Sequence, residues 1–192
     1  MKRLAIAVAV GALFSGTVLA QQGTVQRDVN QQERIEQGLK SGQLTTGEAS
    51  RLEAEQARIQ RDQSRAMRDG TVTPAEKARL ANEQNRASRD INRLDNNART
   101  GDPTSASSQR MQADVQRNVN QQQRIENGLK SGALTTREAG RLERGESRID
   151  RKEARAGRNG SVSAGEQARI QSAQNRESRR IYRQKHDAQT AK

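Results

Sequence analysis

The sequence has almost none of the residues that staple a fold or build a transition-metal site. It contains no cysteine, no tryptophan, one tyrosine, one phenylalanine and one histidine, His186, near the C-terminus. Without cysteine there is no disulfide framework and no thiol chemistry. A lone histidine does not build a zinc or copper site within one chain. Since no nucleophile motif or phosphate-binding glycine loop is present either, we expect a protein without enzymatic activity and without a bound cofactor.

Long apolar runs are missing except at the start of the chain. Lys2 and Arg3 precede an apolar run over residues 4–14, and the stretch closes at Ala20. A basic start followed by a short apolar run is typical of a secretory signal peptide. The run is shorter than the roughly 20 apolar residues that a membrane-spanning helix needs. We therefore expect cleavage after Ala20 and a periplasmic or secreted mature chain that has no transmembrane segment.

Leucine, isoleucine and valine are scarce after residue 20, at a level where disorder is the default expectation. They nevertheless recur at helical spacing among good helix formers. One such stripe runs through Leu80, Gln84, Ala87, Ile91 and Leu94 in steps of four, three, four and three. A stripe this narrow predicts slender, coiled-coil-like packing of helices around a sparse core.

The sequence repeats itself after the apolar start. Residues 25–93 align with residues 115–183 without a gap at an offset of 90, and 41 of the 69 aligned positions are identical. Within each half an eight-residue pattern, [S/D/N]-G-x-[L/V]-[T/S]-x-x-E, occurs twice. We call these four segments the joints, and they cover residues 41–48, 69–76, 131–138 and 159–166. The chain is thus a tandem duplication of a unit that contains two joints.

Each joint has the chemistry of a helix end followed by a helix start. In the first joint, Gly42 can take the positive φ that ends the incoming helix. Thr45 is a good N-cap for the next helix, and Glu48 can reach back to complete a capping box. Two joints in each half predict three helices in each half. The expected helices cover residues 25–40, 46–68, 74–96, 112–130, 136–158 and 164–186.

The predicted fold is therefore all-α, an elongated tandem duplication of a three-helix unit with a sparse core. Between the halves a stretch rich in Asn, Gly, Pro, Thr and Ser has the composition of a flexible linker. The expected organisation is a signal peptide (1–20), helical repeat 1 (21–96), a linker (97–108), helical repeat 2 (109–186) and a tail (187–192).

The second joint, with the sequence DGTVTPAE, resembles the loop of EF-hand calcium-binding proteins. If Asp69 takes the fifth position of that twelve-residue loop, Gly70, Thr73 and Glu76 fall on the sixth, ninth and twelfth positions. These are a ligand position followed by the sharp-turn, ligand and bidentate-ligand positions of the family. The resemblance implies helix-loop-helix geometry and a calcium site at Asp69, Thr73 and Glu76.

The resemblance has two further consequences for the joints. It implies short β-contacts between paired loops, Leu44 with Val72 and Leu134 with Val162. The first and third loop positions, where the family needs oxygen ligands, are occupied in the second joint by Arg65 and Met67. The capping-box interpretation of the glutamates needs no metal, and these two residues favour it.

A second resemblance concerns the Leu-Thr-Thr segments of the first and third joints. Residues 44–48 and 134–138 are similar to the LTxxQ motif of small periplasmic stress proteins and chaperones, with Glu in place of Gln. Those proteins are exported, helical and basic, and they bind unfolded clients. The resemblance implies a client-binding role of the same kind.

The positive charge of the chain, +12 in total, is concentrated in its second half. Residues 108–192 contain 19 Lys and Arg against 10 Asp and Glu, whereas residues 21–107 contain 14 against 13. Such asymmetry indicates an anionic partner for the second half, and arginine suits contacts with phosphate or carboxylate. The predicted contact residues are Arg137, Arg141, Arg144, Arg148, Arg151, Lys152, Arg155, Arg158, Arg176, Arg179, Arg180 and Arg183.

Three hypotheses for function follow from the sequence. The first is an exported scaffold whose basic repeat binds an anionic envelope component, such as lipopolysaccharide phosphates, or an acidic client protein. Nucleic acid is disfavoured because export removes the usual target and Tyr182 alone could stack on bases. The second is an EF-hand-like module that binds a divalent cation, calcium. The third is a structural protein whose helices form a homo-oligomer through their apolar stripes.

Overall fold

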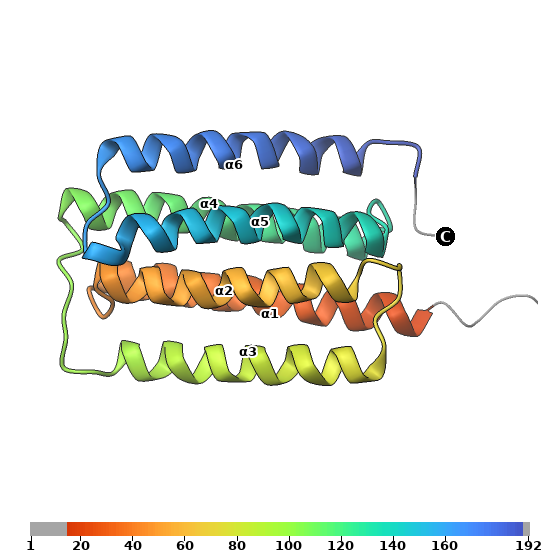
Figure 1. The fold of residues 1–192 in the computed structure, drawn as a ribbon, viewed down its shortest axis with the longest axis horizontal. Coiled ribbons are helices and arrows are strands. Elements are labelled where there is room, and N and C mark those ends of the chain that lie inside the picture. Colours follow the sequence, from red (N-terminus) through yellow and green to blue (C-terminus); the bar gives the residue numbers. More distant parts are fainter. Residues whose placement is uncertain (1–14, 190–192) are drawn as a thin grey trace, which may run out of the picture.

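The structure is a computed structural model that describes residues 15–189, with side chains described from Gly23 onward. This part of the chain contains six α-helices and no strand (Figure 1), which confirms the predicted all-α fold. The helices are α1 (Ser15–Ser41), α2 (Thr46–Ala66), α3 (Pro74–Asp95), α4 (Ala106–Lys130), α5 (Thr136–Ala156) and α6 (Ala164–Lys185), with a short 3-10 helix, η1 (Gly157–Asn159), after α5. Most of the predicted signal peptide, residues 1–14, and the end of the predicted tail lie outside the described residues. None of the helices in residues 15–189 combines the length and the hydropathy that crossing a bilayer requires.

The joints have the local structure that their residues predict. The glycine of each joint has a positive φ, between 73° and 97°. In each joint the Thr or Ser side chain accepts a hydrogen bond from the backbone N–H of the glutamate three residues on, and that glutamate accepts one from the backbone N–H of the capping residue. All four glutamates therefore form capping boxes, as expected. The residues that do so are Thr45 with Glu48, Thr73 with Glu76, Thr135 with Glu138, and Ser163 with Glu166.

The largest difference from the predicted helix ends concerns α1, which begins at Ser15 instead of residue 25. Helix α4 also begins early, at Ala106 instead of residue 112. Its N-cap is Ser105, whose side chain accepts a hydrogen bond from the backbone N–H of Ser108. The added turn is stabilised by burial, because Met111 is fully buried in the apolar cluster that also contains Leu44. The end of the predicted linker is therefore helical, and Gly101, in its remaining part, donates a hydrogen bond to the carbonyl of Gly42 in the first joint.

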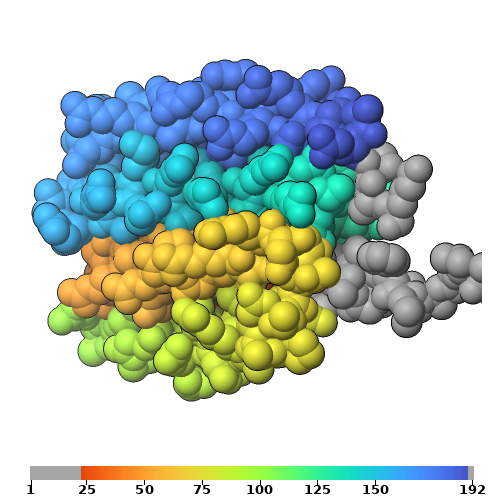
Figure 2. All heavy atoms as spheres, turned by 45° about the vertical axis from the view of Figure 1, so that its right-hand side comes forward, coloured from red at the N-terminus to blue at the C-terminus, as the bar shows by residue number. Residues whose placement is uncertain are grey.

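The two repeats pack face to face along their full length. The most extensive helix packing joins α2 to α5 and α1 to α4, and so connects the repeats. Helix α3 covers one side of this central layer and α6 covers the opposite side (Figure 1). In the space-filling view the first repeat, orange to green, and the second, teal to blue, meet along a continuous seam (Figure 2). The apolar stripes on which the oligomer hypothesis depends are buried within the chain, since Leu80, Gln84, Ala87, Ile91 and Leu94 are the buried residues of α3. Homo-oligomerisation stays a prediction.

The repeats are related by an approximate twofold arrangement that sets which joints meet. Near its centre, Ser147 Oγ donates a hydrogen bond to the carbonyl of Ala57, the equivalent residue of the other repeat, at 2.6 Å. Joints at the two ends of α2 lie a whole helix apart, so the predicted pairing of Leu44 with Val72 is wrong, and the corresponding pairing in repeat 2 is wrong for the same reason. Instead, Leu44 shares an apolar cluster with Val162, and Val72 shares one with Leu134.

Apolar side chains alone do not fill the seam. They form two separate clusters, and on α5 Leu142 belongs to one of them and Ile149 to the other. Buried polar and charged side chains, among them Glu143, Glu146 and Glu153, occupy the same face of α5. We call the buried polar side chains of the seam the polar core.

Close packing at Gly140 of α5 yields a test of the seam. A Cβ built at Gly140 would lie 2.7 Å from the Cβ of Met67 at the end of α2, so one of the helices would have to shift. We expect Gly140→Ala to lower the free energy of unfolding by about 1–3 kcal/mol through overpacking. At Gly165, in the first turn of α6, an added Cβ meets nothing within 4 Å, and Gly165→Ala should cause no loss. Urea unfolding of the two variants checks this, and equal stability would contradict the packing described.

Candidate metal centre

The polar core is built on a stripe of acidic residues in α5. Glu143, Glu146, Asp150 and Glu153 follow one another in steps of three, four and three, which places them on one face of the helix. That face packs on α2, and all four side chains are fully buried. In α2 the equivalent positions, also fully buried, are Glu53, Gln56, Gln60 and Gln63. The two helices thus present the same geometry with different charge.

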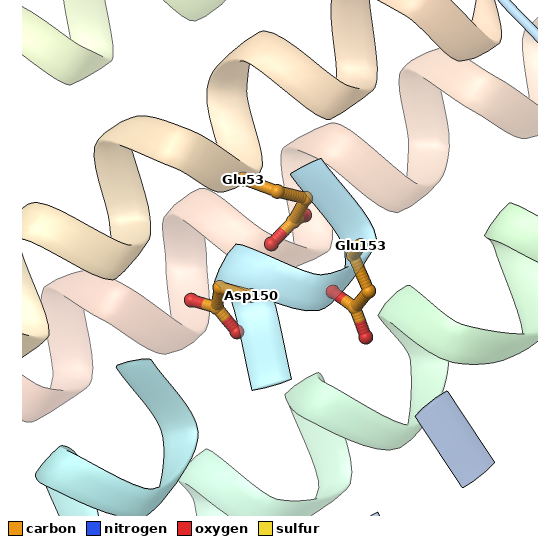
Figure 3. A group of neighbouring side chains, drawn as sticks. All are labelled: Glu53, Asp150 and Glu153. Carbon is orange, nitrogen blue, oxygen red and sulfur yellow. The ribbon is translucent and has the colours of Figure 1, made fainter. Parts of the chain in front are cut away.

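Three carboxylates from two helices meet at one point of the seam, and a fourth, from a third helix, lies near them. We call these four residues the α2–α5 site. Glu53 comes from α2, Asp114 from α4, and Asp150 and Glu153 from α5. Oxygens of Glu53, Asp150 and Glu153 lie within 4.8 Å of one another. Figure 3 shows these three side chains gathered in the space between α2 and α5. The Asp114 carboxylate is close enough for its charge to act on both Glu53 and Glu153.

Side-chain amides hold these carboxylates in place. Gln32 Nε2 donates to Glu53 Oε2 at 3.0 Å, and Asn118 Nδ2 donates to Glu153 Oε2 at 2.6 Å. Gln174 Nε2 donates to Glu153 Oε1 at 3.1 Å. Because the donors approach from α1, α4 and α6, the orientation of the carboxylates depends on packing from several sides of the bundle.

Several oxygens of the α2–α5 site have no hydrogen-bond donor. Both oxygens of Asp114 lack a partner, as do Glu53 Oε1 and Asp150 Oδ2. A neutral side chain also has an oxygen without a donor. It is the amide oxygen of Gln174, a residue that is only 1 % exposed. Buried oxygens without donors are costly in an apolar setting. They are also the atoms that a bound cation would take as ligands.

Burial makes the ionised state of these groups unfavourable. It raises the pKa of Glu53 to about 7, and the neighbouring Asp114 carboxylate acts in the same direction. Burial likewise raises the pKa of Asp114 to about 7. The pKa values of Asp150 and Glu153 lie well above their usual range, again through burial first and then through the charge of Glu53. The ion pairs formed among the described residues include none with these four carboxylates.

The hydrogen-bond network of the polar core is duplicated, but apart from Glu53 and Glu143 the acids named above are not. Gln122 donates to Glu143 in repeat 2 as Gln32 donates to Glu53 in repeat 1. The positions equivalent to Asp150, Glu153 and Asp114 are Gln60, Gln63 and Thr24. The fold therefore accepts glutamine at the positions of Asp150 and Glu153. Structural need alone does not account for the carboxylates of the α2–α5 site.

The residues predicted to bind calcium, Asp69, Thr73 and Glu76, lie in the exposed second joint, away from the α2–α5 site. Asp69 Oδ1 accepts a hydrogen bond from the backbone N–H of Thr71 at 2.9 Å. Glu76 Oε2 accepts hydrogen bonds from the backbone N–H and the hydroxyl of Thr73, at 2.9 and 2.7 Å. These oxygens already have donors within the loop. Calcium binding at this joint stays a prediction.

The twelve predicted contact residues for an anionic partner are all exposed. The structure brings together those at the start of α5 and the end of α6. One surface hollow is lined by Arg137, Arg141 and Arg144 with Arg68 of the first repeat, and a neighbouring one by Arg141, Arg180 and Arg183. We call these six arginines the arginine surface. Arg148, Arg151, Lys152, Arg155, Arg158, Arg176 and Arg179 lie outside these two hollows.

The buried carboxylates are the functional candidates that the sequence analysis missed. Charged residues are almost never fully buried without a partner, so their default place is the surface. A signal was nevertheless present in the spacing. Glu146 and Glu153 alternate with Leu142, Ile149 and Ala156 in steps of four and three. They thus complete the apolar stripe of α5 at positions where a core residue is expected.

The raised pKa values predict how stability depends on pH when no cation is bound. In the unfolded chain carboxylic acids ionise near pH 4, whereas in the folded chain Glu53, Asp114 and Asp28, a fully buried residue of α1, do so near pH 7. The folded state therefore binds more protons in between, and stability falls as the pH rises. In a chelator, the free energy of unfolding should decrease by several kcal/mol from about pH 5 to about pH 8, as measured by urea unfolding. An increase over this range would contradict burial of these groups.

No protein-family model, curated protein or solved structure matches this chain. Function is therefore inferred from the polar core and from the difference between its two copies.

Proposed function

We propose that this protein is an exported, non-catalytic binding protein that holds a hard divalent cation in the α2–α5 site. The observation that carries the proposal is the meeting of three buried carboxylates, with Asp114 near them, none of which forms an ion pair with a described basic residue. In a medium of low dielectric constant, several ionised carboxylates at this separation are not stable unless a positive charge neutralises them. A bound cation supplies that charge from within the site.

The ligand atoms indicate the class of cation. Glu53, Asp150 and Glu153 offer carboxylate oxygens that lie close together, and the nearby Asp114 has two further carboxylate oxygens without donors. Oxygen-only ligand sets suit calcium, magnesium and manganese. Calcium binds its ligands at about 2.4 Å, so two oxygens on one calcium ion lie up to about 4.8 Å apart. Because the mutual distances of the three closest oxygens stay within 4.8 Å, they fit a shared ion of this size.

A cation in this position would join the two repeats. Its ligands come from α2 of repeat 1 and from α4 and α5 of repeat 2, and no covalent link connects these helices at the site. Binding to the folded state alone stabilises that state by mass action. The ion also requires the carboxylates to lose their protons, so binding becomes tighter as the pH rises.

The burial of the site supports binding and not catalysis. Glu53, Asp114, Asp150 and Glu153 are all fully buried, and the amides of Gln32, Asn118 and Gln174 close the gaps between the helices. Catalytic metal sites keep a position open to substrate. A closed site is typical of ions that serve structure or storage.

The internal repeat supplies the variant that tests this proposal. Asp150→Gln combined with Glu153→Gln gives α5 the residues that α2 carries at the equivalent positions, so the fold accommodates them. We expect calcium binding, measured by isothermal titration at about pH 8, to weaken at least about tenfold in Kd because two charged ligands are lost. Loss of a carboxylate pair should also remove part of the pH dependence of stability.

The control for this test is Asp69→Ala in the second joint. If the ion binds in the α2–α5 site, this variant binds calcium as the unmodified chain does. Loss of binding in Asp69→Ala with retention in the double variant would place the ion in the EF-hand-like joint and would contradict the proposal. Absence of binding of calcium, magnesium and manganese to the unmodified chain would contradict both sites.

The arginine surface supports a second candidate function, the binding of a phosphate-bearing surface. Arg68, Arg137, Arg141 and Arg144 surround one hollow where the end of α2 meets the start of α5. In the part of the chain that the structure describes, only Arg180 of the six arginines forms an ion pair, with Glu177. Guanidinium groups left without carboxylates favour contacts with phosphate. Joining arginines of both repeats in one hollow concentrates this charge.

If vesicles bind to the arginine surface, the loss of affinity should depend on which arginines are replaced. The triple variant Arg137→Gln, Arg141→Gln and Arg144→Gln should bind vesicles that contain phosphatidylglycerol more weakly, by roughly 1 kcal/mol for each arginine removed, and with a smaller salt dependence. The matched control replaces Arg151, Arg155 and Arg158, which change the net charge equally at the other end of α5. Equal losses in the two variants, measured by vesicle co-sedimentation, would show that net charge alone governs binding and would contradict a defined surface.

A further inference from the structure

A further basic hollow lies between α4 and α6 at the surface of repeat 2. It encloses about 580 Å³, a volume that suits a small ligand. We call it the α4–α6 hollow. It shares Arg183 with the arginine surface and shares no residue with the α2–α5 site. Its lining residues are Arg124 of α4 and Asn175, Ser178, Arg179, Tyr182 and Arg183 of α6.

The arginines of the α4–α6 hollow have no carboxylate partners. Arg124 is half-buried and held by Ser178, since Nη1 donates to the Ser178 hydroxyl at 2.6 Å and Nη2 donates to the Ser178 carbonyl at 3.1 Å. Arg179 and Arg183 are exposed. None of the ion pairs among the described residues involves these three arginines. One fixed guanidinium and two exposed ones suit the oxygens of a phosphate group.

The corresponding arginines of repeat 1 are paired with acids. Arg34 forms an ion pair with Asp95 at 3.9 Å, and Arg93 forms one with Asp90 at 2.6 Å. In repeat 2 both acids are replaced by basic residues, at the equivalent positions 185 and 180. The duplication has therefore kept the arginines and lost their partners. This difference leaves the hollow of repeat 2 with uncompensated positive charge.

The same comparison adds an aromatic ring to the hollow. Tyr182 stands where repeat 1 has Asn92, and it is 58 % exposed, so it contributes little to the core. Its ring stacks on His186 with the two ring centroids 4.1 Å apart, and His186 Nδ1 lies 2.7 Å from the carbonyl oxygen of Tyr182. The stack fixes the orientation of the ring, and the exposure leaves ring surface on which a ligand can pack.

The lining residues indicate the class of ligand. Arginines bind phosphate, and the C–H face of a sugar ring packs on an aromatic ring such as that of Tyr182. The side chains of Asn175 and Ser178 can hydrogen-bond to sugar hydroxyls. None of the six lining residues is aliphatic. This disfavours an acyl chain or a nucleobase, since both are bound against apolar surfaces.

We propose that the α4–α6 hollow binds a phosphorylated sugar, with its phosphate at Arg124, Arg179 and Arg183 and its ring on Tyr182. A free sugar phosphate and the phosphorylated sugar head of a glycolipid share this chemistry. The inference goes beyond cation binding and does not depend on it, because the hollow and the α2–α5 site have no residue in common.

The composition of the chain supplies a reporter for this site. Tyr182 is its one tyrosine, and it has no tryptophan, so the proton NMR signals of this ring report on the hollow directly. Titration of the mature chain with glucose 6-phosphate in a chelator should shift these signals in a saturable way. Inorganic phosphate and glucose should each bind at least about tenfold more weakly, because each makes only part of the contacts.

Two variants and a control locate the site. Tyr182→Asn introduces the residue of repeat 1, and Arg179→Gln removes one guanidinium. Each should raise the Kd for glucose 6-phosphate at least about fivefold in isothermal titration. Arg155→Gln, which removes an exposed arginine of α5, is the matched control for Arg179→Gln and should leave the Kd unchanged. Circular dichroism of each variant verifies that the helices are retained.

Vesicles that contain lipid A, a phosphorylated glycolipid, distinguish the two sources of the ligand. If the ligand is a glycolipid head, they should bind at least about tenfold more tightly per sugar phosphate than glucose 6-phosphate does. Equal affinity indicates a free sugar phosphate. Either result supports the site if Tyr182→Asn weakens the binding.

The remaining outcomes overturn the proposal. Equal affinity for inorganic phosphate and glucose 6-phosphate would show that the sugar ring is not recognised. Tighter binding of adenosine 5′-monophosphate would place a base on Tyr182 instead of a sugar. Equal losses in Arg179→Gln and Arg155→Gln would show that net charge alone governs binding. Absence of binding to both glucose 6-phosphate and lipid A vesicles would exclude the site.

Discussion

The seam between the two repeats depends on how the carboxylates of α5 are neutralised. Glu143, Glu146, Asp150 and Glu153 are fully buried along the face that packs on α2. Turning this face to solvent would also expose Leu142 and Ile149, so the apolar contacts keep the acids inside. Protons neutralise them at low pH, and none of the ion pairs among the described residues involves these four acids. The proposed cation binding, the expected pH dependence of stability and the packing of the repeats therefore depend on one constraint.

Duplication explains how such a core is tolerated. Repeat 1 carries Gln56, Gln60 and Gln63 where repeat 2 carries three acids, and each repeat orients its buried carboxylates with its own amides, as Gln32 does for Glu53 and Gln122 for Glu143. If both α2 and α5 carried acids at these positions, the buried negative charge would be about twice as large. If both carried amides, the seam would offer no carboxylate ligands to the proposed cation. Positive and negative charges are also separated between the surface and the core. The arginine surface lies at one end of the molecule, and the acids lie within, so the net charge of +12 understates how far the two signs are separated.

Local features of the fold are predictable from the sequence, because they depend on residues close together in the chain. The positive φ of Gly42 and the capping box of Thr45 with Glu48 follow from the joint pattern, and the buried face of α3 follows from its stripe. The meeting of Leu44 with Val162 does not follow, because two nearly identical repeats offer several ways to pair four similar joints. The candidate metal centre was missed for a different reason. The spacing of Glu146 and Glu153 predicts a buried position on the apolar stripe, whereas their charge predicts an exposed one. Only the packing of α2 on α5 shows that they are buried.

The most direct test of the account is a crystal structure of the mature chain grown with manganese and measured at the manganese absorption edge. We expect an anomalous peak between Glu53, Asp150 and Glu153, within coordination distance of their oxygens. A peak in the EF-hand-like joint at Asp69, or no peak in the polar core while these carboxylates stay buried, would contradict the central claim that a cation neutralises the seam.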